Sequence, residues 1–348
     1  MHRFVRNLIT EWRLLELPFK DETIIVAVSG GADSLSLLLA IDDLRKRKKL
    51  DLRFIVAHFD HNLRGESRSD FDFVTRFAAE RGFEVAHGEW HRQAAGNLEQ
   101  AARDARYEFL LQTAENLNAG YVLTAHTMND QAETLMINLI RGSGTAGLGG
   151  MAPIRVLKSD SGRTATDDEV PFLPFERASV KLVRPLLNWA KRRDTENFCL
   201  ENKVDFRRDP MNEDLNFRRV WVRKILIPML QEANPKIVET LCQTAEMLRS
   251  APISLANIRD PHLPEWPATG NLDLKHLRTL DRPHLFLVLR DWIKIHRGNL
   301  RGIGHKHVEA IEKLIHSTKS GRVAEVPGGK AVKHDGRLSW RPENVEKG

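Results

Sequence analysis

The segment from residue 24 to residue 34 constrains the fold of this chain most, because a buried-strand pattern runs straight into a glycine turn and a helix. It reads Ile-Ile-Val-Ala-Val-Ser-Gly-Gly-Ala-Asp-Ser. Gly30 and Gly31 permit a tight turn, after which the first amides of the helix point above the strand, where they attract anions. Ser29 and Ser34 add hydroxyl donors. The segment therefore predicts a phosphate-binding turn.

Asp33 narrows the kind of phosphate ligand. A carboxylate in such a turn repels phosphate unless a divalent cation lies between them, which indicates a metal-nucleotide complex. The sequence contains neither a G-x-x-x-x-G-K-[ST] motif nor a G-x-G-x-x-G after this strand. Residues 29–34 instead resemble the S-G-G-x-D-S pyrophosphate loop (PP-loop) of the N-type ATP pyrophosphatases. Taken alone, the segment also allows a glycine-serine turn that binds no nucleotide.

Composition indicates a globular protein with two or three domains, since the chain has 348 residues, 41% of them hydrophobic and 29% charged. The formal charge of +6 is compatible with a polyanionic partner such as nucleic acid. The two cysteines, Cys199 and Cys242, form no C-x-x-C and predict neither a disulfide framework nor a zinc cluster. Because no apolar stretch reaches the roughly 18 residues of a membrane span, we expect a cytoplasmic protein without membrane contact.

Strand-like and helix-like segments alternate after an amphipathic helix in residues 1 to about 20. The expected strands are 24–28, 52–58, 83–88 and 121–125, and the helices between them begin near Ser34, Ser67, Asn97 and Asn129. Connections of helix length imply parallel strands. The predicted fold class is thus α/β, with a parallel twisted sheet flanked by helices.

The pattern changes after Arg141. Residues 142–150 carry five glycines and precede a polar stretch, which predicts a flexible surface loop. A strand at 180–184 leads into a mostly helical region with basic faces. From about residue 252 we expect a small α+β unit with helices near 273–297 and 304–318 and a hairpin around residues 327–329. The predicted domains are 1–215, 216–255 and 256–348.

Ionisable side chains gather where two of the predicted strands end, and ligands bind at this edge of parallel sheets. The second strand runs into residues 57–67, which include His58, Asp60 and His61 and allow either a metal site or ordinary helix capping. After the fourth strand, Asp130 and Glu133 stand three residues apart on one helix face. That pair could hold Mg²⁺ or an ammonium group, or could form a solvated acidic first turn that the helix dipole favours.

Five segments in one order resemble the tRNA(Ile)-lysidine synthase family: residues 29–34, 57–67, 97–107, 126–134 and 141–151. The resemblance covers residues 1 to about 230 well and the remainder more faintly. It implies a PP-loop ATP pyrophosphatase fold of the adenine nucleotide alpha-hydrolase type. The implied enzyme uses ATP to adenylate O2 of the wobble cytidine in a tRNA(Ile) with a CAU anticodon, releasing pyrophosphate. Free L-lysine then displaces AMP at C2 and gives lysidine.

The resemblance also implies roles for individual residues. The expected ATP-binding residues are Ser29, Gly30, Gly31, Ala32, Asp33, Ser34 and His58. Asp33 and Asp130 are the candidate Mg²⁺ ligands, and Glu133, Asp130 and Arg106 are the candidate lysine-binding residues. The candidate catalytic residues are Asp33, Asp130, His126 and Arg103. Arg103 has a plain alternative, which is pairing with Glu99 on its own helix.

The tRNA is expected to contact basic side chains in the helical region, at Arg207, Arg208, Arg218, Arg219 and Arg223. In the C-terminal appendage, the basic residues expected to help select the tRNA acceptor stem or body are His305, Lys306, His307, Lys330 and Lys333. The active protein is expected to be a monomer or a homodimer.

The sequence departs from the family pattern at three positions. Thr127 and Asn129 stand within the usual His-His-x-Asp-Asp-Gln, and Val220 replaces an expected asparagine. Two other functions therefore stay open. One is that of a related PP-loop enzyme such as a tRNA thiolase, and the other is that of a catalytically silent tRNA-binding protein.

Overall fold

The computed structural model describes residues 1–60, 67–90, 98–157, 179–207, 213–257, 270–280, 282–300, 302–317 and 321–343. The chain divides into two compact units, residues 1–141 with 145–252, and residues 142–144 with 253–348. The expected boundaries at residues 215 and 255 stay predictions.

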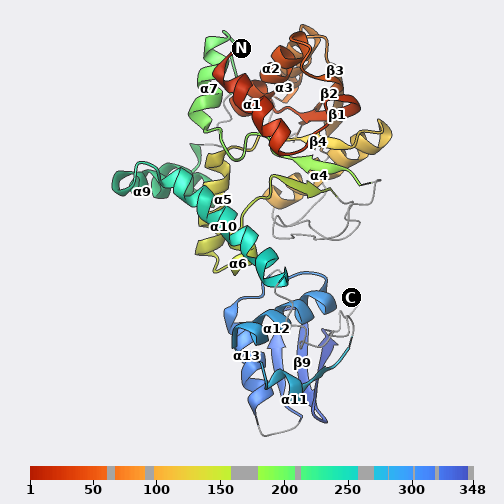
Figure 1. Ribbon diagram of the computed structural model, residues 1–348, viewed down its shortest axis with the longest axis vertical. Helices are drawn as coiled ribbons and strands as arrows, with labels where there is room; N and C mark the ends of the chain where they lie inside the picture. Colours follow the sequence, from red (N-terminus) through yellow and green to blue (C-terminus); the bar gives the residue numbers. More distant parts are fainter. Residues whose placement is uncertain are drawn as a thin grey trace. The chain divides into compact units, whose positions relative to one another are not determined.

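The first unit is built on a six-stranded sheet in the order β3-β2-β1-β4-β6-β5 (Figure 1). Its strands are β1 Lys20–Ala27, β2 Asp51–Asp60, β3 Glu84–Glu89, β4 Tyr121–Leu123, β5 Ile154–Val156 and β6 Lys181–Val183. Neighbouring strands are parallel except β5, which pairs antiparallel with β6. The predicted parallel sheet is confirmed. The edge strand β5 was not predicted, because three residues are too short to show a strand periodicity.

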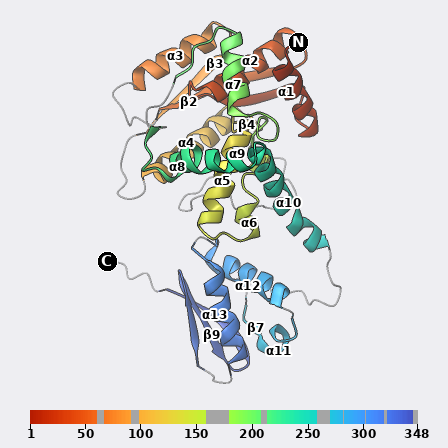
Figure 2. The same cartoon turned by 90° about the vertical axis from the view of Figure 1, so that its left-hand side faces the viewer.

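Helices cover both faces of this sheet (Figures 1 and 2). They are α1 Arg3–Leu14, α2 Ala32–Lys46, α3 Ser67–Ala79, α4 Leu98–Asn116 and α7 Arg192–Glu201. Helices α5 Met128–Ile140 and α6 Thr145–Leu148 follow β4 and lie to one side of the sheet, below it in Figure 1. Side chains alternate between the faces of a strand. Ile24 and Val26 therefore pack with α1, α2, α3 and α7, whereas Ile25 packs with α4 on the opposite face.

Helix α1 ends earlier than the predicted residue 20. Trp12 is fully buried, and its indole Nε1 donates a hydrogen bond to the Pro18 carbonyl at 2.8 Å. Glu16 adopts a left-handed φ of 52°, which turns the chain so that β1 begins at Lys20. The N-terminal helix is thus closed off by a tight turn, and β1 gains residues that the apolar pattern did not mark.

The strand order places a topological switch point between β1 and β4. The chain proceeds from β1 to β2 and β3 on one side and then returns to β4 on the other side of β1. Val26 and Leu123 are paired in register near the carboxyl ends of these two strands. Ligands of open α/β sheets bind in the crevice at such a point. The fold therefore brings together the turn after β1 and the polar segment after β4.

The glycine-rich stretch 142–150 differs from the predicted surface loop. It contains the short helix α6, and Gly147, Gly149 and Gly150 are buried. The Gln131 amide of α5 forms hydrogen bonds of 2.8 and 3.0 Å with the backbone N–H and carbonyl of Met151. The Asn138 amide of α5 also donates to the Gly147 carbonyl at 2.7 Å. Because glycines have no side chains, the backbone polar groups of this stretch are accessible to these two amides, which hold it in place. The polar stretch 158–168 lies outside the described residues.

A helical extension packs against α5 and completes the first unit. It consists of α8 Arg218–Trp221, the π-helical segment η2 Val222–Leu226, α9 Ile227–Ala233 and α10 Ile237–Asn257. Val222, Ile227 and Val238 form one buried cluster with Met128 and Leu135 of α5. This packing fixes the side of α8 and η2 that faces the start of α5.

The second unit pairs two longer helices with an antiparallel sheet in the order β7-β10-β9-β8. Its elements are β7 Leu272–Asp273, α11 Leu274–Leu277, α12 Arg282–Arg297, α13 His305–His316, β8 Val323–Val326, β9 Gly329–His334 and β10 Arg337–Pro342. The predicted α+β unit is confirmed, although its first helix is divided into α11 and α12. Within the described parts of the chain, no helix is long and apolar enough to cross a membrane.

We predict that Trp12→Ala destabilises the protein by about 3–5 kcal/mol, because it removes a large, fully buried side chain and leaves a cavity. Leu14→Ala is the matched control, since Leu14 lies on the same helix with 71% of its surface exposed. Urea unfolding measures both changes. Equal effects of the two substitutions would contradict the account of α1 as a core helix.

Candidate active site

The turn after β1 is organised by its own hydrogen bonds. Gly30 has a φ of +86°, and a Cβ there would meet Val74 at 3.4 Å. The Ser29 N–H donates to Ser34 Oγ at 3.2 Å, and the Ser34 hydroxyl donates to the Gly31 carbonyl at 2.9 Å. Helix α2 begins at Ala32, and the first N–H groups of a helix have no intrahelical acceptor. The turn thus has the geometry of an anion-binding site.

Asp33 lies in the first turn of α2, and its carboxylate accepts a hydrogen bond from the Thr195 hydroxyl of α7. Burial and the negative charge of Asp130 raise the pKa of Asp33 to about 7. Each of the two carboxylates disfavours ionisation of the other, and a bound divalent cation would stabilise both in their charged form. Mg²⁺ is usually held by one or two carboxylates together with substrate phosphates, so this pair fits a metal-nucleotide complex.

Helix α5 presents Asp130 through a capping arrangement at its N-terminus. The Thr127 backbone N–H and hydroxyl each donate to Asp130 Oδ2 at 2.8 Å. Asn129 Oδ1 accepts a hydrogen bond of 3.0 Å from the Arg192 backbone N–H. The two residues that depart from the family pattern here therefore orient the site. Val220, the third departure, is buried.

Glu133 is enclosed by three arginines. Arg223 Nε and Arg219 Nε donate to its two carboxylate oxygens at 2.8 and 2.9 Å, and Arg192 approaches Oε1 at 3.2 Å. Only 1% of the Glu133 side chain is exposed. We call Asp130 and Glu133 the acidic pair. Arg219 and Arg223, both expected to contact tRNA, form ion pairs with it, because the packing of α8 and η2 against α5 turns them toward it.

The same arginines control the charge of Asp130. Arg219 and Arg192 approach Asp130 Oδ1 at 3.0 and 3.5 Å. Burial alone raises the pKa of Asp130, but these two guanidinium groups, together with His126 and the Thr127 N–H, outweigh it and hold the pKa well below its ordinary value. Asp130 is therefore ionised at neutral pH, whereas Asp33 beside it titrates near neutrality.

His126 is held as a neutral imidazole close to this cluster. Its Nδ1 forms a 3.0 Å hydrogen bond with the Thr124 hydroxyl. Burial and the positive charge of Arg184 lower the pKa of His126 well below its usual value. Arg103 and Arg106 on α4 also lower it, which places both of them in the same electrostatic neighbourhood. The side chain of Glu99, the alternative partner of Arg103, lies outside the described residues.

His58 and Arg207 lie against the turn. His58 is buried, its Nδ1 forms a 2.8 Å hydrogen bond with the Val28 carbonyl, and burial lowers its pKa. The Arg207 N–H donates to the Gly30 carbonyl at 2.9 Å, and its side chain lies 3.4 Å from Asp70. Arg218 is exposed on α8. Arg208 and residues 61–66 lie outside the described residues. Among the residues that are described, no group of three or more His, Cys, Asp or Glu side chains could hold a metal ion.

Sequence reasoning missed Arg192 and Thr195. Both lie in the first turn of α7, which follows β6 at the same edge of the sheet as the turn after β1. The available signal was their position after a strand of the parallel sheet, three residues apart and therefore on one helix face. Neither residue type marks chemistry by itself.

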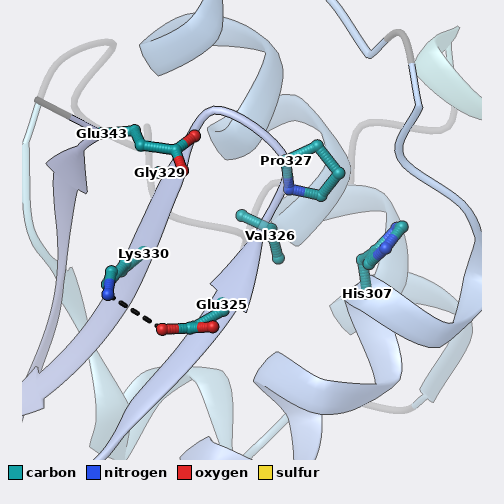
Figure 3. A pocket seen from close by; sticks show the side chains of 7 residues that line it. All are labelled: His307, Glu325, Val326, Pro327, Gly329, Lys330 and Glu343. Atoms are coloured by element: carbon teal, nitrogen blue, oxygen red, sulfur yellow. Dashed lines mark hydrogen bonds and ion pairs between the residues drawn. The ribbon is translucent and has the colours of Figure 1, made fainter. Parts of the chain in front are cut away.

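The second unit contains a polar pocket of about 320 Å³ at the β8–β9 turn (Figure 3). It is lined by His307, Glu325, Val326, Pro327, Gly329, Lys330 and Glu343. His307 and Lys330, both expected to contact tRNA, therefore belong to one pocket. Lys333 instead is buried, and its ammonium group donates to the Ile315 carbonyl at 3.3 Å near the end of α13.

The chain matches two protein families, the PP-loop domain over residues 3–230 and the TilS substrate binding domain over residues 272–339. It is 32% identical to the tRNA(Ile)-lysidine synthase of Synechocystis sp., over 90% of this chain and 89% of that protein. It is 34% identical to the synthase of Solibacter usitatus and 32% identical to that of Porphyromonas gingivalis. The chain spans 64% and 57% of the lengths of these two relatives.

The fold is also similar to that of the U34-tRNA thiolase NcsA from Methanococcus maripaludis, which was solved with its [4Fe-4S] cluster. The TM-score is 0.54 at 16% sequence identity, and the alignment covers 71% of this chain and 80% of the thiolase. At this identity the similarity supports the PP-loop fold and carries no conclusion about chemistry.

We predict that Asp33→Asn stabilises the protein increasingly as the pH rises. The folded-state pKa of about 7 lies above the ordinary carboxyl value of 3.8, so the unfolded chain loses this proton first and rising pH favours unfolding. The gain should grow between about pH 4 and pH 7 and level off near 4 kcal/mol, roughly the size of that pKa difference. Urea unfolding without Mg²⁺ measures it.

Asp43→Asn is the control for this measurement, because Asp43 lies at the other end of the same helix and pairs with Arg47. It should show no comparable gain at high pH. A constant difference between Asp33→Asn and the parent protein across the pH range would contradict the assignment of Asp33.

Proposed function

Because the chain belongs to the tRNA(Ile)-lysidine synthase family of PP-loop proteins, we propose that it ligates free L-lysine to C2 of a wobble cytidine. The substrate is a tRNA(Ile) with a CAU anticodon. ATP first adenylates O2 of the cytidine with loss of pyrophosphate, and the amine of lysine then displaces AMP to give lysidine. The observation that carries the proposal is the meeting of a turn with anion-binding geometry and a buried acidic pair at the β1–β4 switch point.

The turn after β1 binds the pyrophosphate part of ATP in this proposal. Ser29, Gly30, Gly31 and Ser34, with the amides at the start of α2 from Ala32, donate hydrogen bonds to phosphate oxygens. Mg²⁺ between Asp33 and Asp130 would neutralise charge that develops as pyrophosphate leaves. His58 supports the turn from β2 through its hydrogen bond to the Val28 carbonyl.

The α-phosphate is proposed to lie toward α4 and the end of β4. Arg103 and Arg106 supply positive charge there, and His126 can donate one hydrogen bond as a neutral imidazole. A neutral imidazole suits this position because it can donate a hydrogen bond to the α-phosphate without gaining or losing a proton as the adenylate forms. These three roles are supported by the shared electrostatic neighbourhood of the side chains.

Lysine is proposed to bind at Glu133 and Asp130. An ammonium group must be held by acidic groups and must lose a proton before it can attack C2, so a carboxylate acceptor is needed nearby. Arg106 is proposed to meet the carboxylate of the amino acid. The fully buried position of Glu133 is typical of a group whose charge is used inside a site and not at the protein surface.

The tRNA is proposed to approach along α8 and the segment around Arg207. Arg218 is exposed there, and Trp221 is 40% exposed one turn further along the same helix. Guanidinium groups bind phosphate, and exposed aromatic rings stack with unpaired bases. Arg208 belongs to the same proposed surface. The C-terminal unit, which matches a substrate binding domain, is proposed to contact the body of the tRNA.

A thiolase function is disfavoured by the cysteines. The sequence contains two, fewer than the four that usually hold an iron–sulfur cluster. Cys199 lies near the turn and donates to the Ala32 carbonyl at 3.4 Å, but burial and Asp33 raise its pKa to about 12. Sulfur chemistry requires a thiolate, which this environment suppresses. Catalytic silence is disfavoured because Thr127 keeps Asp130 in place and Asn129 holds the backbone of Arg192, which contacts Asp130.

The proposal is tested by incubating the protein with ATP and Mg²⁺ and following pyrophosphate and AMP separately. Pyrophosphate release should require tRNA(Ile) with a CAU anticodon, and AMP release should require lysine as well. A tRNA(Met) with the same anticodon is the control. Tight tRNA binding without release of either product would support the silent tRNA-binding function instead.

Asp33→Asn should abolish tRNA-dependent pyrophosphate release while leaving tRNA affinity within about threefold of the parent, because the substitution removes a charge from the nucleotide site alone. Filter binding measures tRNA affinity. If affinity and pyrophosphate release fall together, Asp33 maintains the structure and does not assist catalysis.

Arg218→Gln should weaken tRNA binding and reduce the slope of log affinity against log salt by about 1, as expected for the loss of one phosphate contact. Lys20→Gln is the control, since Lys20 is exposed at the start of β1, outside the proposed tRNA surface. An unchanged salt slope in Arg218→Gln would remove Arg218 from the tRNA interface.

A further inference from the structure

The acidic pair assigned to lysine is already engaged by the protein's own arginines. The side chains of Glu133 and Asp130 are 1% and 12% exposed, whereas those of Arg192, Arg219 and Arg223 are 22–29% exposed. The guanidinium groups thus lie between the carboxylates and solvent. A lysine that binds to these carboxylates has to replace some of the arginine contacts.

Positive charge already exceeds negative charge among the groups that are paired here. Asp130 and Glu133 supply two negative charges, and Arg192, Arg219 and Arg223 supply three positive charges. An added ammonium group would place a fourth positive charge in a largely buried environment, which is costly unless an anion enters with it. Lysine binding is therefore expected to depend on a negatively charged ligand.

Phosphate is the anion that fits. Guanidinium groups bind phosphate as well as carboxylate through paired hydrogen bonds. Arg192 contacts Asp130 and Glu133, and Thr195, on the same turn of α7, donates a hydrogen bond to Asp33 in the turn after β1. Arg192 is thus positioned to exchange a carboxylate of α5 for a phosphate bound above α2.

The backbone that carries Arg223 is unusual. Arg219 and Arg223 are four residues apart and both contact Glu133, but Arg223 lies within the π-helical segment η2. A π-helical turn inside a longer helix is rare and occurs frequently at functional sites. Here it sets the position of a guanidinium group at the edge of the acidic pair.

We propose that Arg192, Arg219 and Arg223 are exchangeable counter-ions, which pair with Asp130 and Glu133 until phosphate enters and then transfer to phosphate. The transfer opens the carboxylates to the ammonium group of lysine, so lysine binds after a phosphate ligand. This inference rests on the proposed function. The phosphate comes from the triphosphate of ATP or from the tRNA backbone, and no covalent bond changes in the exchange.

The direct test is calorimetric titration of the whole protein with L-lysine in four conditions. These are no addition, the ATP analogue AMPCPP with Mg²⁺, tRNA(Ile) alone, and both together. AMPCPP is used because its methylene bridge prevents cleavage between the α and β phosphates. We expect phosphate ligands to strengthen lysine binding by about 5- to 150-fold, the usual range of coupling between two sites. By linkage, lysine must strengthen AMPCPP binding by the same factor.

Arg223→Gln should reduce this coupling, because the cluster then carries one positive charge fewer and accepts lysine without phosphate. Arg223→Lys keeps the charge and should retain most of the coupling. Arg193→Gln is the matched control, since Arg193 precedes Asp194 on α7 and its side chain is 74% exposed. If Arg223→Gln does not fold, the titrations of the parent protein still decide the matter.

The outcomes separate this inference from the proposed function. Equal lysine affinity in all four conditions overturns the counter-ion exchange and leaves lysine as the substrate. Lysine binding that tRNA alone strengthens assigns the exchange to backbone phosphate, and strengthening by AMPCPP alone assigns it to the nucleotide. No lysine binding in any condition overturns the proposed function, and the inference with it.

Discussion

The site depends on one interaction, the enclosure of two carboxylates of α5 by guanidinium groups from two other helices. Glu133 receives hydrogen bonds from Arg219 and Arg223, and Arg192 contacts both Glu133 and Asp130. A buried carboxylate without these partners would carry an uncompensated charge, which typically costs several kcal/mol. The cluster therefore joins the sheet domain to its helical extension at the place where chemistry is proposed.

The phosphate-binding turn depends less on its surroundings. Its geometry comes from Gly30, the Ser34 hydroxyl and the start of α2, all within a few residues of sequence. Asp33 connects the turn with the acidic cluster, because its pKa responds first to burial and then to Asp130. The two halves of the site are thus coupled by charge, with the anion-binding part formed locally and the cation-binding part formed by tertiary packing.

This division explains how much could be predicted from the sequence. Residues 29–34 and the pair Asp130 and Glu133 are local patterns, and both lie where the predicted parallel sheet places them. Arg219 and Arg223 were predicted to contact tRNA. Their pairing with Glu133 could not be predicted, because a basic helix gives no sign of which side packs against α5. Arg192 and Thr195 were not assigned to the site, because neither residue type marks chemistry by itself. Edge strand β5 depends on its pairing with β6, and the buried glycines Gly147, Gly149 and Gly150 lie in a stretch held by side-chain amides of α5, neither of which periodicity records.

The most direct test of the function is the identity of the wobble nucleoside after reaction. Both tRNA(Ile) and tRNA(Met) with CAU anticodons are incubated with the protein, ATP, Mg²⁺ and isotope-labelled lysine, then digested to nucleosides for mass spectrometry. The account predicts that labelled lysidine replaces cytidine in tRNA(Ile) alone. Unchanged cytidine despite ATP cleavage, or a sulfur-containing nucleoside in its place, would contradict it.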